Sequence, residues 1–385
     1  MLLLKNVFLI PQLTDSKLKI ADILIKDGYI IKIEKDIKNL SSKITTIDLK
    51  DRFLTPGFID LHLHLTLTGS DTLHDNFRNN YYKCMQAYSS ALASLKAGFT
   101  TIRDLGSDDR IVNHVRDAIN KNSLPGPTII SAGKILTPTE TGNEYFSQMY
   151  QECDGHDEVM KYVRNEIKQG ADFIKLMCSG AFMNPGGDPQ QLLYSDEEII
   201  TAVKIAKTKN KYVAAHAHGS EAIKQCIRCG VRTIEHATMI DDKAIQELST
   251  SNSKKKNKSN NNTFIVPTIT AFVDTPFIEN IRNAYESKLI IGFGTDQGIE
   301  NTFHGQNANE FIFRKKLIGM KDIDILLQAT KYNSIIAQID KSVGTIDVGK
   351  KADLVILNKD PTKDIIACKD AVHMVIKNGK REGKN

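Results

Sequence analysis

Two histidines separated by one residue, His62 and His64, stand near the end of an apolar run that begins at Phe58. Successive side chains of a β-strand point to opposite faces, so these two imidazoles share a face and can both reach one metal ion. The turn residues Thr-Pro-Gly (55–57) come directly before the run and indicate that a strand begins there. The pair therefore predicts a metal site at the end of a buried strand.

The chain between residues 58 and 344 alternates short apolar runs with helix-like segments, one of which opens with a capping box at Ser195 to Glu198. Eight strand–helix units in succession are typical of an α/β fold, and they predict a closed parallel (β/α)8 barrel of the TIM type. The predicted strands are Phe58–Leu65, Thr100–Gly106, Thr128–Gly133, Phe173–Ser179, Tyr212–His218, Thr233–Thr238, Phe264–Ile269 and Ile290–Asp296.

Both ends of the chain are rich in strand patterns, with a hairpin turn at Lys-Asp-Gly (26–28). We therefore predict a small β-sandwich domain formed by both termini, residues 1–57 and 345–385, beside a barrel of residues 58–344. The stretch 249–262 contains only Ser, Thr, Asn and Lys. Such a composition cannot form a core, so it is predicted to be a disordered insertion after the sixth strand.

The C-terminal ends of parallel barrel strands meet at one mouth, where catalytic groups collect. Histidine and aspartate are common zinc ligands. A lysine there is unusual, because a positive ammonium group beside metal ions is repelled and must be neutral or chemically altered. The predicted strand ends carry one lysine, four histidines and one aspartate: Lys175, His62, His64, His216, His236 and Asp296.

These residues and their surroundings resemble the amidohydrolase superfamily. The resemblance rests on Thr-Pro-Gly-Phe-Ile-Asp-Leu-His-Leu-His (55–64), the strand-end lysine, the two later strand-end histidines and Gly-Thr-Asp (294–296), and it extends to the closing run 344–357. Val-Ala-Ala-His-Ala-His-Gly (213–219) and Ile-Lys-Leu-Met-Cys-Ser-Gly (174–180) are similar to the imidazolonepropionase-like branch, which includes Xaa-Pro and Xaa-Arg dipeptidases and ochratoxinase-type amidases.

The resemblance implies two divalent metal ions, with zinc the expected metal, bridged by a carboxylated Lys175. It assigns His62, His64, Lys175 and Asp296 to one ion, and the carbamate, His216 and His236 to the other. A shared hydroxide would attack an amide carbonyl, and Asp296 would pass its proton to the leaving nitrogen. The expected activity is cleavage of an amide or peptide bond in a small carboxylate-bearing substrate, a dipeptide or an N-acyl amino acid.

Three further residues are candidate substrate contacts. His218 shares a strand face with His216, at a place where relatives often have a substrate-binding tyrosine, so a catalytic or substrate-binding role stands against a structural one. His304 follows the last strand and is expected at the mouth. Tyr194 follows the fourth strand, where a packing role competes with substrate binding. Arg103 and Asp104 are expected to form a structural ion pair.

Two departures from the relatives concern the substrate pocket. The loop 139–143 after the third strand lacks the histidine that relatives commonly carry, and the connection 271–289 is short. The alternatives are a cyclic amide hydrolase or an aminohydrolase on the same scaffold, and a metal-free scaffold protein. Lys175 argues against a deaminase, and the complete set of ligands argues against a scaffold.

The composition is that of an ordinary globular protein of 385 residues. Four lysines within 254–258 contribute four of the positive charges in the net charge of +5, so the rest of the chain is nearly neutral. No nucleic-acid partner is therefore expected. No signal peptide or membrane-spanning run is recognised, and the six cysteines are scattered. These features predict a cytoplasmic enzyme with a small-molecule substrate and no membrane partner, while a homo-oligomer is expected from the relatives alone.

Overall fold

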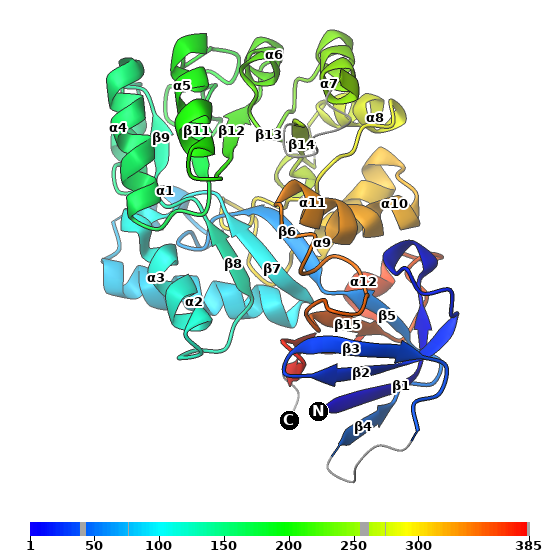
Figure 1. Ribbon diagram of the computed structural model, residues 1–385. Coiled ribbons are helices and arrows are strands. Elements are labelled where there is room, and N and C mark those ends of the chain that lie inside the picture. The colour runs from blue at the N-terminus through cyan, green and yellow to red at the C-terminus, as the bar shows by residue number, and fades with distance from the viewer. Residues whose placement is uncertain (39–43, 76, 255–261, 274, 383–385) are drawn as a thin grey trace.

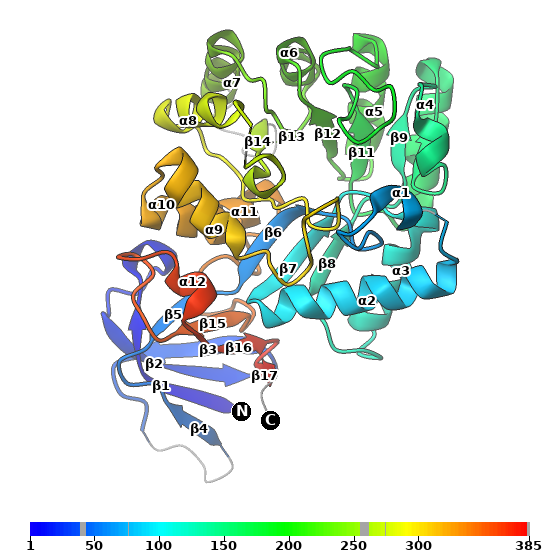
Figure 2. The ribbon, with the colours of Figure 1, turned by 180° about the vertical axis from the view of Figure 1, so that it is seen from behind.

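The computed structural model describes residues 1–38, 44–75, 77–254, 262–273 and 275–382. Strands from both ends of the chain form a sheet at the bottom of Figure 1, where the two termini lie close together. The middle of the chain lies above it and consists of parallel strands with helices on their outer side. Figure 2 gives the same arrangement from behind.

The terminal sheet has eight strands, of which β1 and β5 come from the N-terminal segment and lie at its centre. The predicted sandwich is one hydrogen-bonded sheet, because β1 pairs with β4 over its first half and with β5 over its second. The change of partner falls at Asn6, whose φ is 57°. The strands are β1 (Leu2–Leu9), β2 (Ile20–Lys26), β3 (Tyr29–Glu34), β4 (Thr45–Asp48), β5 (Phe53–Pro56), β15 (Leu354–Leu357), β16 (Val372–Lys377) and β17 (Lys380–Glu382).

The middle of the chain forms two parallel sheets, ordered β6-β7-β8 and β10-β9-β11-β12-β13-β14. Seven of the eight predicted strands occur, with shorter bounds, whereas β9 and β10 were not predicted. The strands are β6 (Phe58–Leu63), β7 (Phe99–Asp104), β8 (Thr128–Ser131), β9 (Ile135–Thr137), β10 (Tyr150–Glu152), β11 (Ile174–Met177), β12 (Val213–Ala217), β13 (Thr233–His236) and β14 (Phe264–Val266).

Backbone hydrogen bonds join these two sheets at both sides. The amide of Asp172 donates to Ser131 at the end of β8 (2.8 Å). On the other side, residues 291–297 lie between β14 and β6, where Gly292 donates to Ile265 (2.9 Å) and Leu61 donates to Phe293 (3.0 Å). The predicted eighth strand is therefore present only as isolated bridges at residues 291 and 297.

The helices cover the outer side of the parallel strands with apolar faces that belong to one large core. The predicted capping box is confirmed at α5, where the Ser195 hydroxyl and the Glu198 carboxylate each accept the other residue's backbone amide. The helices are α1 (Thr72–Asp75), α2 (Asn80–Lys96), α3 (Ile111–Asn120), α4 (Gly155–Lys168), α5 (Asp196–Lys207), α6 (Ser220–Cys229), α7 (Asp242–Lys254), α8 (Ile278–Glu286), α9 (Asn309–Phe313), α10 (Asp322–Leu327), α11 (Asn333–Ile336) and α12 (Ala367–Asp370).

The predicted disordered insertion 249–262 begins as helix, because α7 continues to Lys254. The Asn252 side chain fixes this end by bonding both backbone groups of Thr263 (2.8 and 3.0 Å). Residues 255–261 lie outside the described residues. Within the described part of the chain, no helix combines the length and the apolar character needed to cross a bilayer.

Candidate active site

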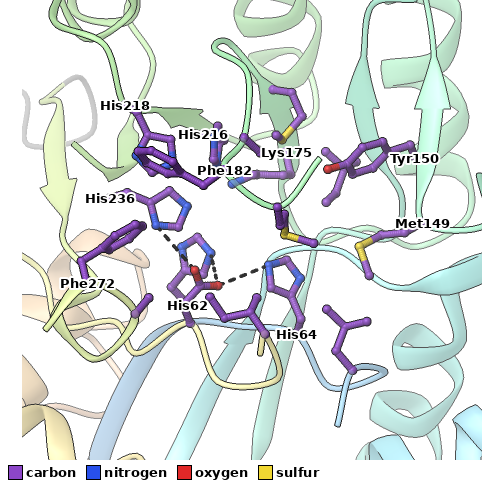
Figure 3. Close-up of a pocket in the computed structure, with 18 residues that line it drawn as sticks. His62, His64, Met149, Tyr150, Lys175, Phe182, His216, His218, His236 and Phe272 are labelled. Atoms are coloured by element: carbon purple, nitrogen blue, oxygen red, sulfur yellow. Dashed lines mark ion pairs between the residues drawn. The ribbon is translucent and has the colours of Figure 1, made fainter. Parts of the chain in front are cut away.

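The ends of the parallel strands surround one pocket of about 220 Å³. Figure 3 shows histidines from β6, β12 and β13 converging on it, with Lys175 of β11 beside them. All of the predicted metal ligands line this pocket and are buried: His62, His64, Lys175, His216, His236 and Asp296. The structure thus brings together side chains that are as far as 234 positions apart in the sequence, from His62 to Asp296.

Asp296 lies at the centre of the histidines. Its Oδ1 is 3.3 Å from Nε2 of His62 and 3.6 Å from Nε2 of His64, and its Oδ2 is 3.7 Å from Nδ1 of His236. The backbone amide of Asp296 donates to the His62 carbonyl (2.8 Å), and its φ of 59° turns the chain into the pocket. A Cβ at Gly294 would lie 2.8 Å from the His62 Cβ, so this close approach requires glycine.

The donor atoms fit bound cations. Nε2 of His62 and Oδ1 of Asp296 are buried and have no hydrogen-bond partner, a condition that costs roughly 1–3 kcal/mol per group unless another ligand satisfies it. Two groups of three residues each have their possible ligand atoms within 4.8 Å of one another. One group is His62, His236 and Asp296, and the other is His216, His218 and His236. Imidazole nitrogens and a carboxylate oxygen are donors that suit zinc.

Burial holds most of these histidines in the neutral form that binds metals. It lowers the pKa of His64 to about 4 and the pKa of His218 to about 3, and it holds the pKa values of His216 and His236 well below the usual range. Burial also lowers the pKa of Lys175 to about 8. The pocket therefore opposes positive charge on these five side chains. His62 differs, because burial also opposes its charge but the Asp296 and Glu235 carboxylates outweigh burial and raise the pKa of His62 above its usual value.

Glu235 is a site residue that the sequence interpretation missed. Its Oε2 accepts a hydrogen bond from Nδ1 of His62 (2.9 Å), while Nη2 of Arg103 donates to its Oε1 (2.8 Å). Burial by itself would raise the pKa of Glu235, but the charge of Arg103 and the bond from His62 lower that pKa to about 2. The carboxylate therefore fixes the His62 tautomer and directs Nε2 toward Asp296.

The predicted ion pair between Arg103 and Asp104 is wrong, because neighbouring strand residues face opposite sides. Arg103 points inward to Glu235 and to the Leu61 carbonyl (2.6 Å). The Asp104 carboxylate instead accepts the backbone amides of Leu65 (2.9 Å) and Gly106 (3.2 Å). Asp104 thereby supports the loop that follows β6 and carries His64.

Glu235→Gln is expected to weaken zinc binding roughly 10–100-fold, as is typical when the hydrogen-bond partner of a metal-binding histidine is lost. An amide can present its NH2 group to Nδ1 of His62 and so favour the wrong tautomer. Competition with a chromogenic chelator measures the affinity. Glu166→Gln is the matched control, because Glu166 is also buried and paired with an arginine, Arg110. Equal losses in both variants would contradict a specific role for Glu235.

Of the three predicted substrate contacts, one lines the pocket and two do not. His218 lines the pocket and is held by the Thr238 hydroxyl (2.9 Å from Nδ1). His304 lies behind the wall, because its Nε2 donates to the carbonyls of His64 (3.2 Å) and Leu67 (3.0 Å). Tyr194 packs into the large core with its hydroxyl 3.1 Å from the Cys153 sulfur, so it too faces away from the pocket.

Most of the remaining lining is apolar. The Tyr150 hydroxyl is its main additional polar group, and it donates to Asn184 (3.1 Å). Among the described lining residues there is no arginine. The apolar lining residues are Leu67, Ile135, Met149, Met177, Ala181, Phe182, Met183, Ala271, Phe272 and Ile299.

Residues 53–381 match the sequence model of the amidohydrolase family. The chain belongs to this family. It is 25% identical to ochratoxinase of Aspergillus niger over 94% of this chain and 83% of that protein. It is also 25% identical to imidazolonepropionase of Thermoanaerobacter pseudethanolicus over 88% of this chain and 84% of that protein. A solved structure of a Xaa-Pro dipeptidase with bound methionine is similar over the whole of both chains, with a TM-score of 0.87 at 28% identity.

The resemblance predicted from the motifs is thereby confirmed for this amidohydrolase. Membership of the family indicates a hydrolase of carbon–nitrogen bonds in small molecules, and the similar solved structure indicates a TIM-barrel-type fold with a small additional domain. Members of the family generally depend on metal ions, which agrees with the donor groups described above.

Proposed function

We propose that this amidohydrolase uses two divalent metal ions to cleave an amide or peptide bond in a dipeptide or an N-acyl amino acid. The observation that carries the proposal is the pair of buried atoms without a hydrogen bond, Nε2 of His62 and Oδ1 of Asp296, which face each other at 3.3 Å beside histidines whose pKa values burial lowers. We further propose that residues 58–344 form a closed barrel in which the bridged segment 291–297 takes the place of the eighth strand, and that residues 1–57 and 345–385 form the small domain.

The proposed residue roles follow from position. His62, His64 and Asp296 would hold one ion and His216 and His236 the other, with carboxylated Lys175 between them. Zinc, the proposed metal, would supply an activated water and polarise the amide carbonyl. Asp296 then accepts a proton on its carboxylate and delivers it to the leaving nitrogen. His218 faces the pocket with Nδ1 bonded to Thr238, which leaves Nε2 to bind the substrate carbonyl or carboxylate.

Recognition of a substrate carboxylate would rely on neutral donors. Lys175 is the one cation among the described lining residues, and it is assigned to the metal ions. The loop 139–143 lacks the histidine that relatives commonly carry. Its Asn143 side chain is used within the loop region, because it donates to the Pro138 carbonyl and to Glu152 (both 2.9 Å). We therefore propose that the carboxylate of an N-acyl amino acid lies toward the open mouth of the pocket.

Metal content of protein purified without added metal or chelator tests the proposal, together with hydrolysis of a dipeptide and N-acyl amino acid panel. The expected result is about two divalent ions per chain, as a two-metal site requires, and turnover that a chelator removes and zinc restores. One ion per chain would instead favour an aminohydrolase. No ion, with no uptake from zinc and bicarbonate, would favour a non-catalytic scaffold.

A cyclic amide hydrolase is the second candidate, because imidazolonepropionase is among the similar proteins. Adding a dihydropyrimidine and an imidazolone to the panel separates the two activities, since ring opening releases no second product. A cytoplasmic location and a homo-oligomeric state remain predictions. All six cysteines are free thiols, in keeping with a reducing compartment.

A further inference from the structure

Three phenylalanines from two separate connections meet beside the pocket, and two of them, Phe182 and Phe272, line it. Phe182 follows β11, whereas Phe272 and Phe277 lie between β14 and α8. The ring centroid of Phe182 is 5.8 Å from that of Phe272 and 5.8 Å from that of Phe277, and the last two are 6.3 Å apart. We call these residues the phenylalanine cluster.

The phenylalanine cluster touches the candidate metal site directly. The rings of Phe182 and His218 meet edge to face at 4.7 Å, and Phe272 lies 5.6 Å from His218 and 5.9 Å from His236. These separations are those of favourable aromatic pairs. Figure 3 shows Phe182 and Phe272 beside these two histidines. A group bound against the cluster would therefore lie next to the bond that is cleaved.

The walls next to the cluster would exclude a charged group. Met149, Met177 and Met183 line the pocket, and their flexible side chains adapt to irregular apolar shapes. Among the described lining residues, the charged side chains are Lys175 and Asp296, both of them assigned to the metal site. An ionised substrate group placed among the phenylalanines and methionines would lose hydration without gaining a partner.

Phe182 is also unusually exposed for a large apolar side chain, since half of its surface (50%) is open to solvent. Concave sites with apolar walls and a few converging polar groups are typical of small-molecule binding. A ligand that covers the Phe182 ring would remove this apolar surface from water, which favours binding.

We propose that the phenylalanine cluster is a subsite for a large uncharged apolar group of the substrate, preferably an aromatic ring, adjacent to the scissile bond. This inference rests on the proposed amide hydrolysis and narrows its substrate class. An N-acyl amino acid would then carry an aryl or similarly bulky group on one side of the amide, with its carboxylate directed to the mouth.

Binding of uncleavable neutral analogues tests the subsite without turnover. Titration calorimetry on the zinc-loaded protein compares N-methylbenzenesulfonamide with N-methylmethanesulfonamide, which differ only in ring against methyl. We expect the aryl compound to bind about 10-fold more tightly or better, as for hydrophobic pockets that discriminate by size. Phe182→Ala should bring the two Kd values close together. The control is Phe77→Ala, because Phe77 is 80% exposed and is not a lining residue.

A hydrolysis experiment distinguishes failure of the aryl subsite from failure of the proposed amide hydrolysis. The kcat/KM of N-benzoylglycine and of N-acetylphenylalanine is compared with that of N-acetylglycine, and Phe182→Ala should lower the ratio for the preferred aryl substrate. Hydrolysis without an aryl preference, or a preference that Phe182→Ala leaves unchanged, would overturn the subsite alone. If the aryl analogue binds more tightly but no amide is hydrolysed, the proposed function is overturned. The cluster would then not be a subsite for a substrate of amide hydrolysis.

Discussion

Asp296→Asn is expected to lower turnover about 1,000-fold or more while most of the metal stays bound. General acid–base catalysis contributes roughly 10²–10⁴-fold, and an amide cannot accept and return the proton that the proposed mechanism assigns to this carboxylate. The amide keeps Oδ1, which can still act as a ligand atom. Asparagine also tolerates a positive φ, so the backbone at φ 59° should be preserved.

Metal content and kcat must be measured on the same sample, because loss of metal would also lower turnover. The control is Asp157→Asn in the first turn of α4, where the carboxylate is exposed. Metal retained with turnover lost would support the proton-transfer role. Unchanged turnover in metal-loaded Asp296→Asn would refute it.

The candidate metal site could be predicted because strand geometry places its residues. His62 and His64 share a face by alternation, and parallel strands bring the ends of β6, β11, β12 and β13 to one pocket. The motif Gly-Thr-Asp identified Asp296 even though residues 290–296 form no regular strand. The left-handed φ of Asp296, which interrupts extended pairing, arises from the tertiary structure and is invisible in the apolar pattern.

Long-range contacts explain what the sequence did not reveal. Glu235 precedes His236 and would face the opposite side by simple alternation, yet it contacts His62, which lies 173 positions away. A charged residue in the interior of the predicted strand 233–238 was the available signal. His304 and Tyr194 lie in connections, where side-chain direction depends on neighbours such as the Leu67 carbonyl and Cys153.

The phenylalanine cluster was unpredictable for the same reason. Its members span 95 positions, from Phe182 to Phe277, in two connections whose sequence shows no clear periodic pattern. Only the folded chain places them against His218. The role proposed for these two connections, substrate selection, could therefore be inferred only from the folded structure.

Lys175→Ala is expected to abolish activity and to remove most of the bound metal, if Lys175 carries the bridging carbamate. Carbamate formation joins the neutral amine nitrogen to the carbon of CO2 and releases one proton. Burial lowers the pKa of Lys175 to about 8, so the neutral amine becomes more abundant as the pH rises through that value. Metal uptake by the metal-free protein should therefore depend on bicarbonate and should increase between about pH 7 and 8.

Carbon-13 NMR of protein reconstituted with zinc and labelled bicarbonate gives a readout independent of activity. The wild-type protein should show a carbamate resonance that is absent from Lys175→Ala and present in the control Lys17→Ala, whose lysine is exposed. Acetate should partly restore metal binding to Lys175→Ala, because it can supply two carboxylate oxygens in the space left by the side chain. A fully active Lys175→Ala protein would mean that the histidines and Asp296 hold the metal without a bridge. That result would remove the lysine from the proposed mechanism.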